Sequence, residues 1–226
     1  MLEIQDIKKS FGNKDVLKGI SLQFLPGYIY GIAGENGAGK TTLFRCISGL
    51  EISEGAIYSP YDILKNHIGL LPTNPKIISR ITGWEYLKLL ALARSVKEDD
   101  FEDQNIFDLP LNEFAEHYST GMKKKLALMA ILLQKNDIYI LDEPFNGVDI
   151  QSNMVIQSIL QKLKALGKTV LISSHIFSTL RESCDFIHLL REGEIKMSSD
   201  KSNFTTIERE MIKGSTTNKL NLLRLT

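Results

Sequence analysis

One octapeptide restricts the possible folds of this chain more than any other feature. Residues 34 to 41 read GENGAGKT and fit the pattern G-x-x-x-x-G-K-[ST]. A compact apolar segment, Ile29 to Ala33, precedes this loop, and a helix-like pattern from residue 42 to 47 follows it. Glycines let such a loop point successive backbone N–H groups into one concavity, where the helix N-terminus also attracts anions. The sequence therefore predicts a strand, a loop and a helix that hold a nucleoside triphosphate with magnesium.

Within this loop, two side chains are expected to carry most of the chemistry. Lys40 would reach the β- and γ-phosphates, and Thr41 would offer its hydroxyl to Mg²⁺. Contacts to the nucleotide are expected from Gly34, Asn36, Gly37, Ala38, Gly39, Lys40, Thr41 and Thr42.

Charge and cysteine content narrow the class of protein. Lys plus Arg and Asp plus Glu each number 27 among 226 residues, so no bulk positive field is present and no nucleic-acid partner is expected. Cys46 and Cys184 lack metal-type spacing and are interpreted as reduced cytosolic thiols. The longest apolar run, residues 126 to 133, is too short to span a bilayer, and the first residues lack a signal-peptide core. A cytoplasmic chain is predicted.

Apolar segments alternate with helical patterns along most of the chain. Short strands are expected at 29–33, 68–71, 138–141, 169–173 and 187–190, and helices at 122–135 and 155–166. This alternation favours a parallel sheet with helices on both faces. The opening residues suggest a small antiparallel β-lobe. Periodicity from residue 77 to 117 suggests an all-helical insertion.

Two adjacent carboxylates follow the apolar strand at 138–141. Alone, Asp142 and Glu143 would more often form a turn or a helix cap. If a second parallel strand brings them beside the phosphate loop, Asp142 can hold Mg²⁺ through water, and Glu143 can orient the water that attacks the γ-phosphate. Lys40 and Glu143 are therefore expected to be catalytic, and Asp142 is an expected metal ligand together with Thr41.

Residues 142 to 149, DEPFNGVD, resemble the combined Walker B motif and D-loop of the ATP-binding cassette (ABC) family, the ATPase subunits of membrane transporters. The resemblance covers about residues 1–200. It implies an α/β P-loop NTPase core, a mostly parallel sheet flanked by helices, with an antiparallel β-lobe and a helical subdomain. The β-lobe and RecA-like core would occupy about 1–73 and 136–200, and the helical signature subdomain about 76–135. Residues 201–226 would be a C-terminal tail, with room for a short helix.

The same resemblance assigns roles to four further residues. Phe11 falls where the family places an aromatic residue that stacks on adenine, although a lone phenylalanine is more often a core residue. In the segment YSTGM, Ser119 and Gly121 remain from the family signature, which faces the ATP bound on the other subunit. His175 follows a buried strand, as does the family's switch histidine, which contacts the γ-phosphate and helps the glutamate to hold the water. The resemblance therefore implies that His175 is a third catalytic residue.

At one position the chain departs from the family pattern. Thr73 stands where the family has a glutamine that touches magnesium and relays movement to the membrane partner. A hydroxyl is shorter than a carboxamide, so a bridging water or Asn74 would have to substitute, and we expect slower or differently coupled hydrolysis.

The resemblance implies an ATP-hydrolysing subunit that works with a second ABC ATPase subunit, identical or different, and a separate transmembrane permease. ATP and Mg²⁺ are the expected cofactors, and a peripheral position on the inner face of the cell membrane is expected, in an exporter-type system. One alternative is a catalytically weak, ATP-gated binding module in a heterodimer. Glu143 and His175 argue against it, because degenerate sites usually lose these residues. A soluble, non-transport ABC ATPase is the other alternative.

Overall fold

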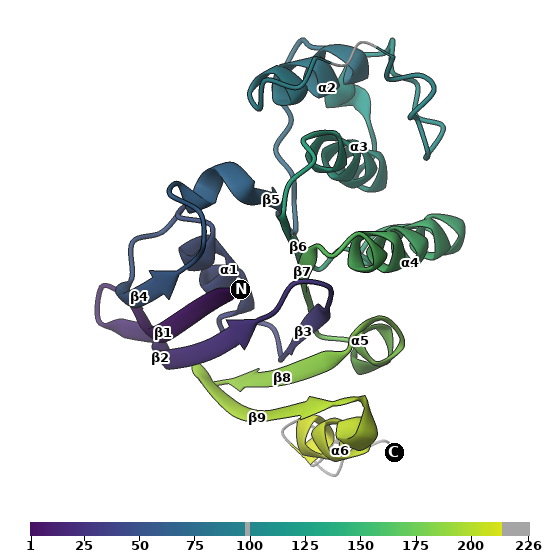
Figure 1. Cartoon of the computed structure of the whole chain (residues 1–226). Helices are drawn as coiled ribbons and strands as arrows, with labels where there is room; N and C mark the ends of the chain where they lie inside the picture. The colour runs from purple at the N-terminus through teal and green to yellow at the C-terminus, as the bar shows by residue number, and fades with distance from the viewer. Residues whose placement is uncertain (98–99, 214–226) are drawn as a thin grey trace, which may run out of the picture.

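The computed structural model describes residues 1–97 and 100–213. A six-stranded sheet has the order β5-β6-β7-β3-β8-β9, in which the first five strands are parallel and β9 runs antiparallel to β8 (Figure 1). Its strands are β3 (Ile29–Ala33), β5 (Ile68–Leu71), β6 (Ile138–Asp142), β7 (Thr169–Ser174), β8 (Phe186–Arg191) and β9 (Glu194–Asp200). All residues of β3, β6 and β7 are buried, as expected for parallel strands covered on both faces.

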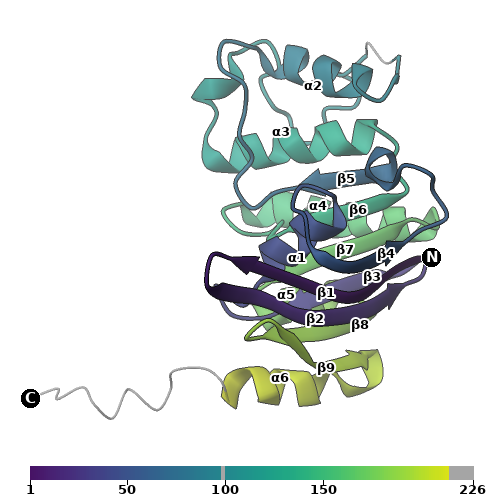
Figure 2. The ribbon, with the colours of Figure 1, turned by 90° about the vertical axis from the view of Figure 1, so that its left-hand side faces the viewer.

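A second, antiparallel sheet has the order β2-β1-β4 and is formed by β1 (Leu2–Phe11), β2 (Lys14–Phe24) and β4 (Glu54–Tyr58). Figure 2 shows it in front of the larger sheet. Helix α1 (Lys40–Ile47) lies between the two sheets, where its apolar side chains join one buried cluster with residues of both. This cluster includes Leu43, Phe44, Ile47, Ile4, Phe24, Ile32 and Ile140. The predicted β-lobe and mostly parallel sheet are confirmed.

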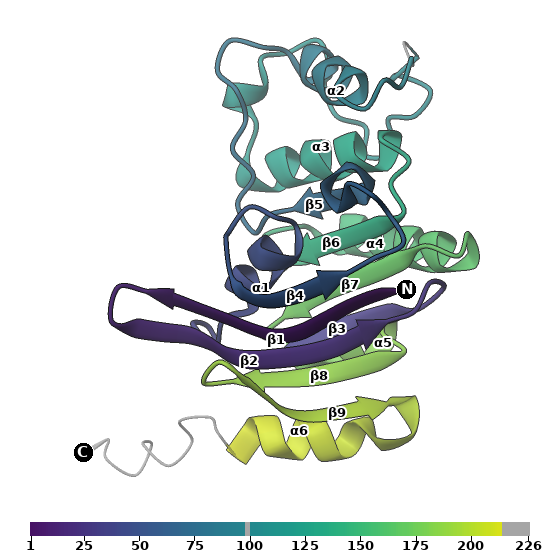
Figure 3. The same cartoon turned by 60° about the vertical axis from the view of Figure 1, so that its left-hand side comes forward.

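The other helices cover the opposite face of the large sheet or lie beside its outer strands. Helices α4 (Ile150–Ala165) and α5 (Phe177–Ser183) pack against β7, and α6 (Phe204–Lys213) lies along β8 and β9 (Figure 3). Helix α2 (Gly83–Leu92) packs on α3 (Thr120–Leu133), which contacts β5. Short 3₁₀ turns occupy Leu64–His67, Ala115–His117 and Lys201–Asn203.

The all-helical insertion predicted for residues 77–117 is wrong. In the described parts of this segment, residues 77–97 and 100–117, only α2 and a 3₁₀ turn are helical, and Ser95 just after α2 has a φ of 56°, outside the helical region. Between them, the Asn105 side chain hydrogen-bonds both the N–H and the C=O of Leu109, which fixes a turn. Phe101 is fully buried in this loop. The apolar periodicity therefore reflected loop side chains packed into the core rather than a longer helix. The division of the chain near residues 76 and 135 stays a prediction.

Two features of the fold bear on function. A short helix does form in the tail, as α6, while residues 214–226 of the predicted tail lie outside the described residues. The register pairs Ala33 with Ser174 and Asp142 with Ser173. The carboxyl ends of β3, β6 and β7 therefore meet at one edge of the sheet, where parallel α/β sheets bind their ligands.

Candidate functional site

A cavity of about 600 Å³ opens at this edge of the sheet. Segments distant in sequence converge on it: the end of β1, the loop before α1, the segment after β5, and the residues that follow β6 and β7. Its lining consists of Phe11, Lys14, Val16, Glu35, Asn36, Gly37, Gly39, Lys40, Thr41, Thr42, Thr73, Glu143, Asn146 and His175.

The loop between β3 and α1 has backbone angles that suit an anionic ligand, while the N–H of Ala38 donates to Glu35 O (3.2 Å). Gly37 and Gly39 have φ values of 85° and 111°, which favour glycine. No side chain caps the N-terminus of α1, whose cap residue is Gly39. Lys40 is 6% exposed, and its Nζ donates to the carbonyls of Gly34 (2.6 Å) and Glu35 (3.2 Å). An uncapped helix N-terminus beside a buried ammonium group fits an anionic phosphate chain.

Asp142, at the end of β6, is the point where three hydroxyl groups meet. Its Oδ2 accepts hydrogen bonds from Thr41 Oγ1 (2.6 Å) and Thr73 Oγ1 (2.5 Å). Its Oδ1 accepts one from Ser173 Oγ (2.5 Å). The side chains of Thr41, Thr73 and Asp142 supply hard oxygen atoms next to the phosphate loop, which is the donor set that Mg²⁺ prefers. The residues present therefore fit a magnesium ion bound together with a nucleotide.

Glu143 directs its carboxylate into the cavity. Its Oε2 lies 3.0 Å from Nδ1 of His175, and its Oε1 lies 3.3 Å from Nζ of Lys40. The Oε1 atom is buried and accepts no hydrogen bond from the described residues. The Lys40 ammonium group offsets part of the charge on this atom without donating a hydrogen bond to it, so the atom fits a ligand that brings a hydrogen of its own, such as a bound water.

Comparisons with known proteins agree with this geometry. The family model described as "ABC transporter" matches residues 17–146. The chain is 30% identical over 222 residues to the lantibiotic transport ATP-binding protein SrtF of Streptococcus pyogenes, which covers 92% of this chain and 94% of SrtF. It is 31% identical over 209 residues to the bacitracin transport ATP-binding protein BcrA of Enterococcus faecalis, covering 86% and 68%.

A solved structure of an ATP binding subunit of an ABC transporter superposes with a TM-score of 0.81 at 27% identity, covering 98% of each chain. The chain belongs to the ABC transporter family. The resemblance drawn from residues 142–149 is thus confirmed, and the chain is an ABC ATPase. Within residues 1–97 and 100–213, this ABC ATPase has no helix of the length and apolarity needed to cross a bilayer.

Not every predicted residue of the ABC ATPase lines the main cavity. Gly34 and Ala38 border a neighbouring cavity of about 420 Å³ beside β8. Ser119 is exposed and caps α3 by accepting a 3.2 Å hydrogen bond from Met122 N. Gly121 packs closely against the loop after β6: a Cβ atom added to Gly121 would lie 2.8 Å from the carbonyl oxygen of Gly147. Neither Ser119 nor Gly121 therefore lines the cavity that Lys40 and Glu143 line.

Several residues of the site were not predicted from the sequence. Lys14, Val16 and Asn146 line the cavity. Asn146 lies inside the motif that carried the resemblance, whereas Lys14 and Val16 belong to β2 and carry no sequence signal. Ser173 donates to Asp142 and also accepts a 2.9 Å hydrogen bond from Glu143 N. One indication of this role was present in the sequence, because Ser173 lies at the end of an apolar segment that was expected to form a strand of the same parallel sheet as Asp142.

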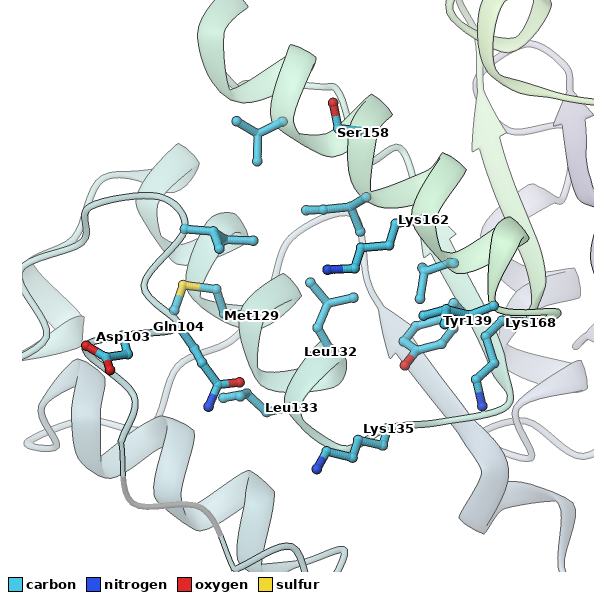
Figure 4. A pocket seen from close by; sticks show the side chains of 15 residues that line it. Asp103, Gln104, Met129, Leu132, Leu133, Lys135, Tyr139, Ser158, Lys162 and Lys168 are labelled. Atoms are coloured by element: carbon cyan, nitrogen blue, oxygen red, sulfur yellow. The ribbon is translucent and has the colours of Figure 1, made fainter.

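A second cavity of this ABC ATPase, about 620 Å³ in volume, lies between α3 and α4 (Figure 4). Met129, Leu132 and Leu163 contribute apolar lining, with Lys135 and Lys162 also at the cavity. Among the described residues, the two cavities share no lining residue. The apolar cavity is therefore separate from the loop that carries Lys40.

Proposed function

We propose that the cavity at Lys40 binds ATP and that Glu143 accepts the proton of the water that attacks the γ-phosphorus. The observation that carries this assignment is the Oε1 atom of Glu143, buried without a donor and 3.3 Å from the Lys40 ammonium. Lys40 would exchange its bonds to Gly34 and Glu35 for the β- and γ-phosphate oxygens. His175, 3.0 Å from the other Glu143 oxygen, would fix the direction of that carboxylate. The products are ADP and phosphate.

The metal assignment rests on the hydroxyl groups around Asp142. When bound, Mg²⁺ neutralises charge on the β- and γ-phosphates. Thr41 and Asp142 would hold it, and Thr73 would take part through the hydroxyl that already contacts Asp142 Oδ2. Nucleotide contacts would come from Gly34, Asn36, Gly37, Ala38, Gly39 and Thr42 of the loop and α1.

The nucleotide base is proposed to stack on Phe11. This ring is 49% exposed at the end of β1 and lines the cavity. Lys9 belongs to the same strand, and its Nζ lies 4.9 Å from the centroid of the Phe11 ring. Stacking requires only an exposed π face, so phenylalanine can serve where a hydroxyl is absent.

We propose further that two ATPase subunits sandwich the nucleotides. Ser119 is exposed, and neither it nor Gly121 lines the cavity of its own chain. Both sit at the N-terminus of α3, and a helix N-terminus attracts phosphate. Such a surface can complete the site of a second ATPase subunit.

The transport role is inferred from the relatives. SrtF and BcrA are named as transport ATP-binding proteins for a lantibiotic and for bacitracin. We propose that this chain likewise drives a separate transmembrane permease, in an exporter-type system, from the cytoplasmic face of the membrane. ATP-driven closure of two ATPase subunits would supply the movement.

Purification from native membranes tests this function. The chain should co-purify with a hydrophobic polypeptide and release phosphate from MgATP, and Lys40→Met should abolish that release. A preparation that binds ATP and dimerises but never releases phosphate, even with its membrane partner, would support the catalytically weak binding module instead. Recovery without any membrane polypeptide would favour a soluble, non-transport ATPase.

A further inference from the structure

A buried lysine joins α3 to the loop that carries Glu143. Lys124 is 2% exposed, and its Nζ donates to the carbonyl oxygens of Glu143 (2.8 Å) and Asn146 (2.6 Å). Burial lowers the pKa of Lys124, while the nearby carboxylates of Glu143 and Asp142 oppose that shift. In the sequence Lys124 is one of three consecutive lysines, 123 to 125, at the start of a helix. Only the middle lysine of the three is buried.

The backbone held by Lys124 adopts a conformation that needs support. Glu143 has a φ of 51°, which costs a non-glycine residue free energy and persists only where surrounding contacts enforce it. Its carbonyl accepts hydrogen bonds from both Lys124 Nζ and Asn146 N (3.2 Å), and its N–H donates to Ser173 Oγ. Lys124 is therefore one of three partners that fix the backbone from which the Glu143 carboxylate projects.

We propose that Lys124 is a positioning residue for ATP hydrolysis, which holds the backbone of Glu143 and Asn146 so that the Glu143 carboxylate points at the attacking water. This inference rests on the proposed role of Glu143. Lys124 does not line the cavity, so it acts through the backbone and not on the nucleotide. A small movement of this carboxylate is enough to matter, since a displacement of a catalytic group by about 1 Å can lower a rate about 100-fold.

The same contact links Glu143 to the N-terminus of α3. Lys125 Nζ contacts Asp149 Oδ2 (3.1 Å) and Ser152 Oγ (3.0 Å), and Gly121 packs against Gly147. The first turns of α3 and residues 143–149 thus form one joined unit.

The test compares Lys124→Met with Lys123→Met on the same helix. Lys124→Met keeps a long, unbranched side chain and removes the N–H donors of Nζ. The side chain of Lys123 donates to Glu116 O and has no hydrogen bond to residues 143–149, so Lys123→Met serves as the matched control. We expect Lys124→Met to lower kcat at least about tenfold while KM and the affinity for MgATP change less than about threefold. Lys124→Gln keeps one donor and should retain more activity. In a Glu143→Gln background, Lys124→Met should lower the residual rate less than about threefold, because its target is already lost.

Each other outcome has a defined meaning. Equal kcat values for Lys124→Met and Lys123→Met, a parallel loss of ATP affinity, or additive losses in the Glu143→Gln background would overturn the inference. If Lys124→Met does not fold, the comparison is made with Lys124→Gln, and a failure of both to fold would assign Lys124 to the stability of the fold alone. Absence of ATP turnover in the wild-type protein would instead contradict the proposed function itself.

Discussion

Replacing Thr73 with valine tests the arrangement around Asp142, because the two side chains have nearly the same shape. Thr73 Oγ1 donates a 2.5 Å hydrogen bond to Asp142 Oδ2, the oxygen that also accepts from Thr41. Asp142 is 1% exposed, so its carboxylate depends on these donors to offset the loss of hydration. Valine removes one donor and leaves the branched side chain in place.

The size of the effect follows from the charge and exposure of the pair. A hydrogen bond to a charged group contributes about 1.5–3 kcal/mol to stability. Thr73 is half-buried, so water can partly replace its hydroxyl, and we expect a loss near the lower limit, about 1.5 kcal/mol. For a domain of this length that loss corresponds to a fall in Tm of about 3–6 °C. If the hydroxyl also supports the metal, the affinity for Mg²⁺ should fall about 10–100-fold.

Two measurements check this prediction. Calorimetry of the nucleotide-free protein gives the change in Tm, and ATPase activity against free Mg²⁺ at saturating ATP gives the change in metal requirement. The control is Thr206→Val, which removes from α6 a hydroxyl that donates a hydrogen bond to Asn203 Oδ1 in the preceding 3₁₀ turn. A Tm within about 1 °C of the wild type and an unchanged Mg²⁺ requirement would refute the role given to Thr73. Thr73→Gln should alter the rate or the Mg²⁺ requirement, and no change in either would remove the idea that this position slows hydrolysis.

Two further predictions concern packing and protonation. Gly121→Ala should lower the free energy of unfolding by about 1–3 kcal/mol, because the added Cβ would lie 2.8 Å from Gly147 O. Urea titrations compare it with Thr120→Ala, and equal stability of the two variants would count against this contact. Burial lowers the pKa of His188 to about 4, so the unfolded chain binds more protons between pH 4 and 6.5 and stability falls as the pH drops through that range. From pH 7 to 5 the loss should be about 2 kcal/mol in the wild type and nearly absent in His188→Asn, as measured by denaturant unfolding at each pH; equal losses in both proteins would exclude His188 as the source.

Local sequence patterns predicted much of the site because its parts meet by a general rule of parallel sheets. The loop at Lys40, the acids after β6 and the histidine after β7 all follow strands whose carboxyl ends share one edge. No such rule predicts which of the three consecutive lysines 123–125 is buried. Lys124 is buried because α3 lies close to a loop 19 residues further along the chain. The loop around Phe101 was misread for a related reason, since tertiary packing overrode its helical periodicity.

The contact between Thr73 and Asp142 also lies beyond sequence reasoning. The sequence showed a hydroxyl where a carboxamide was expected and predicted that a bridging water or Asn74 would compensate. In the structure Thr73 reaches Asp142 directly over 2.5 Å. The position of the segment after β5, and not the length of the side chain alone, decides this distance.

The central claim is that Glu143 activates the water which attacks ATP held at Lys40, and substitution of this carboxylate by its amide tests it most directly. Glu143→Gln and the wild type should be compared for equilibrium binding of MgATP and for steady-state release of phosphate. We expect binding within about threefold of the wild type and phosphate release lower by a factor of at least about 100. Turnover that survives the substitution unchanged, or loss of MgATP binding together with turnover, would contradict the account.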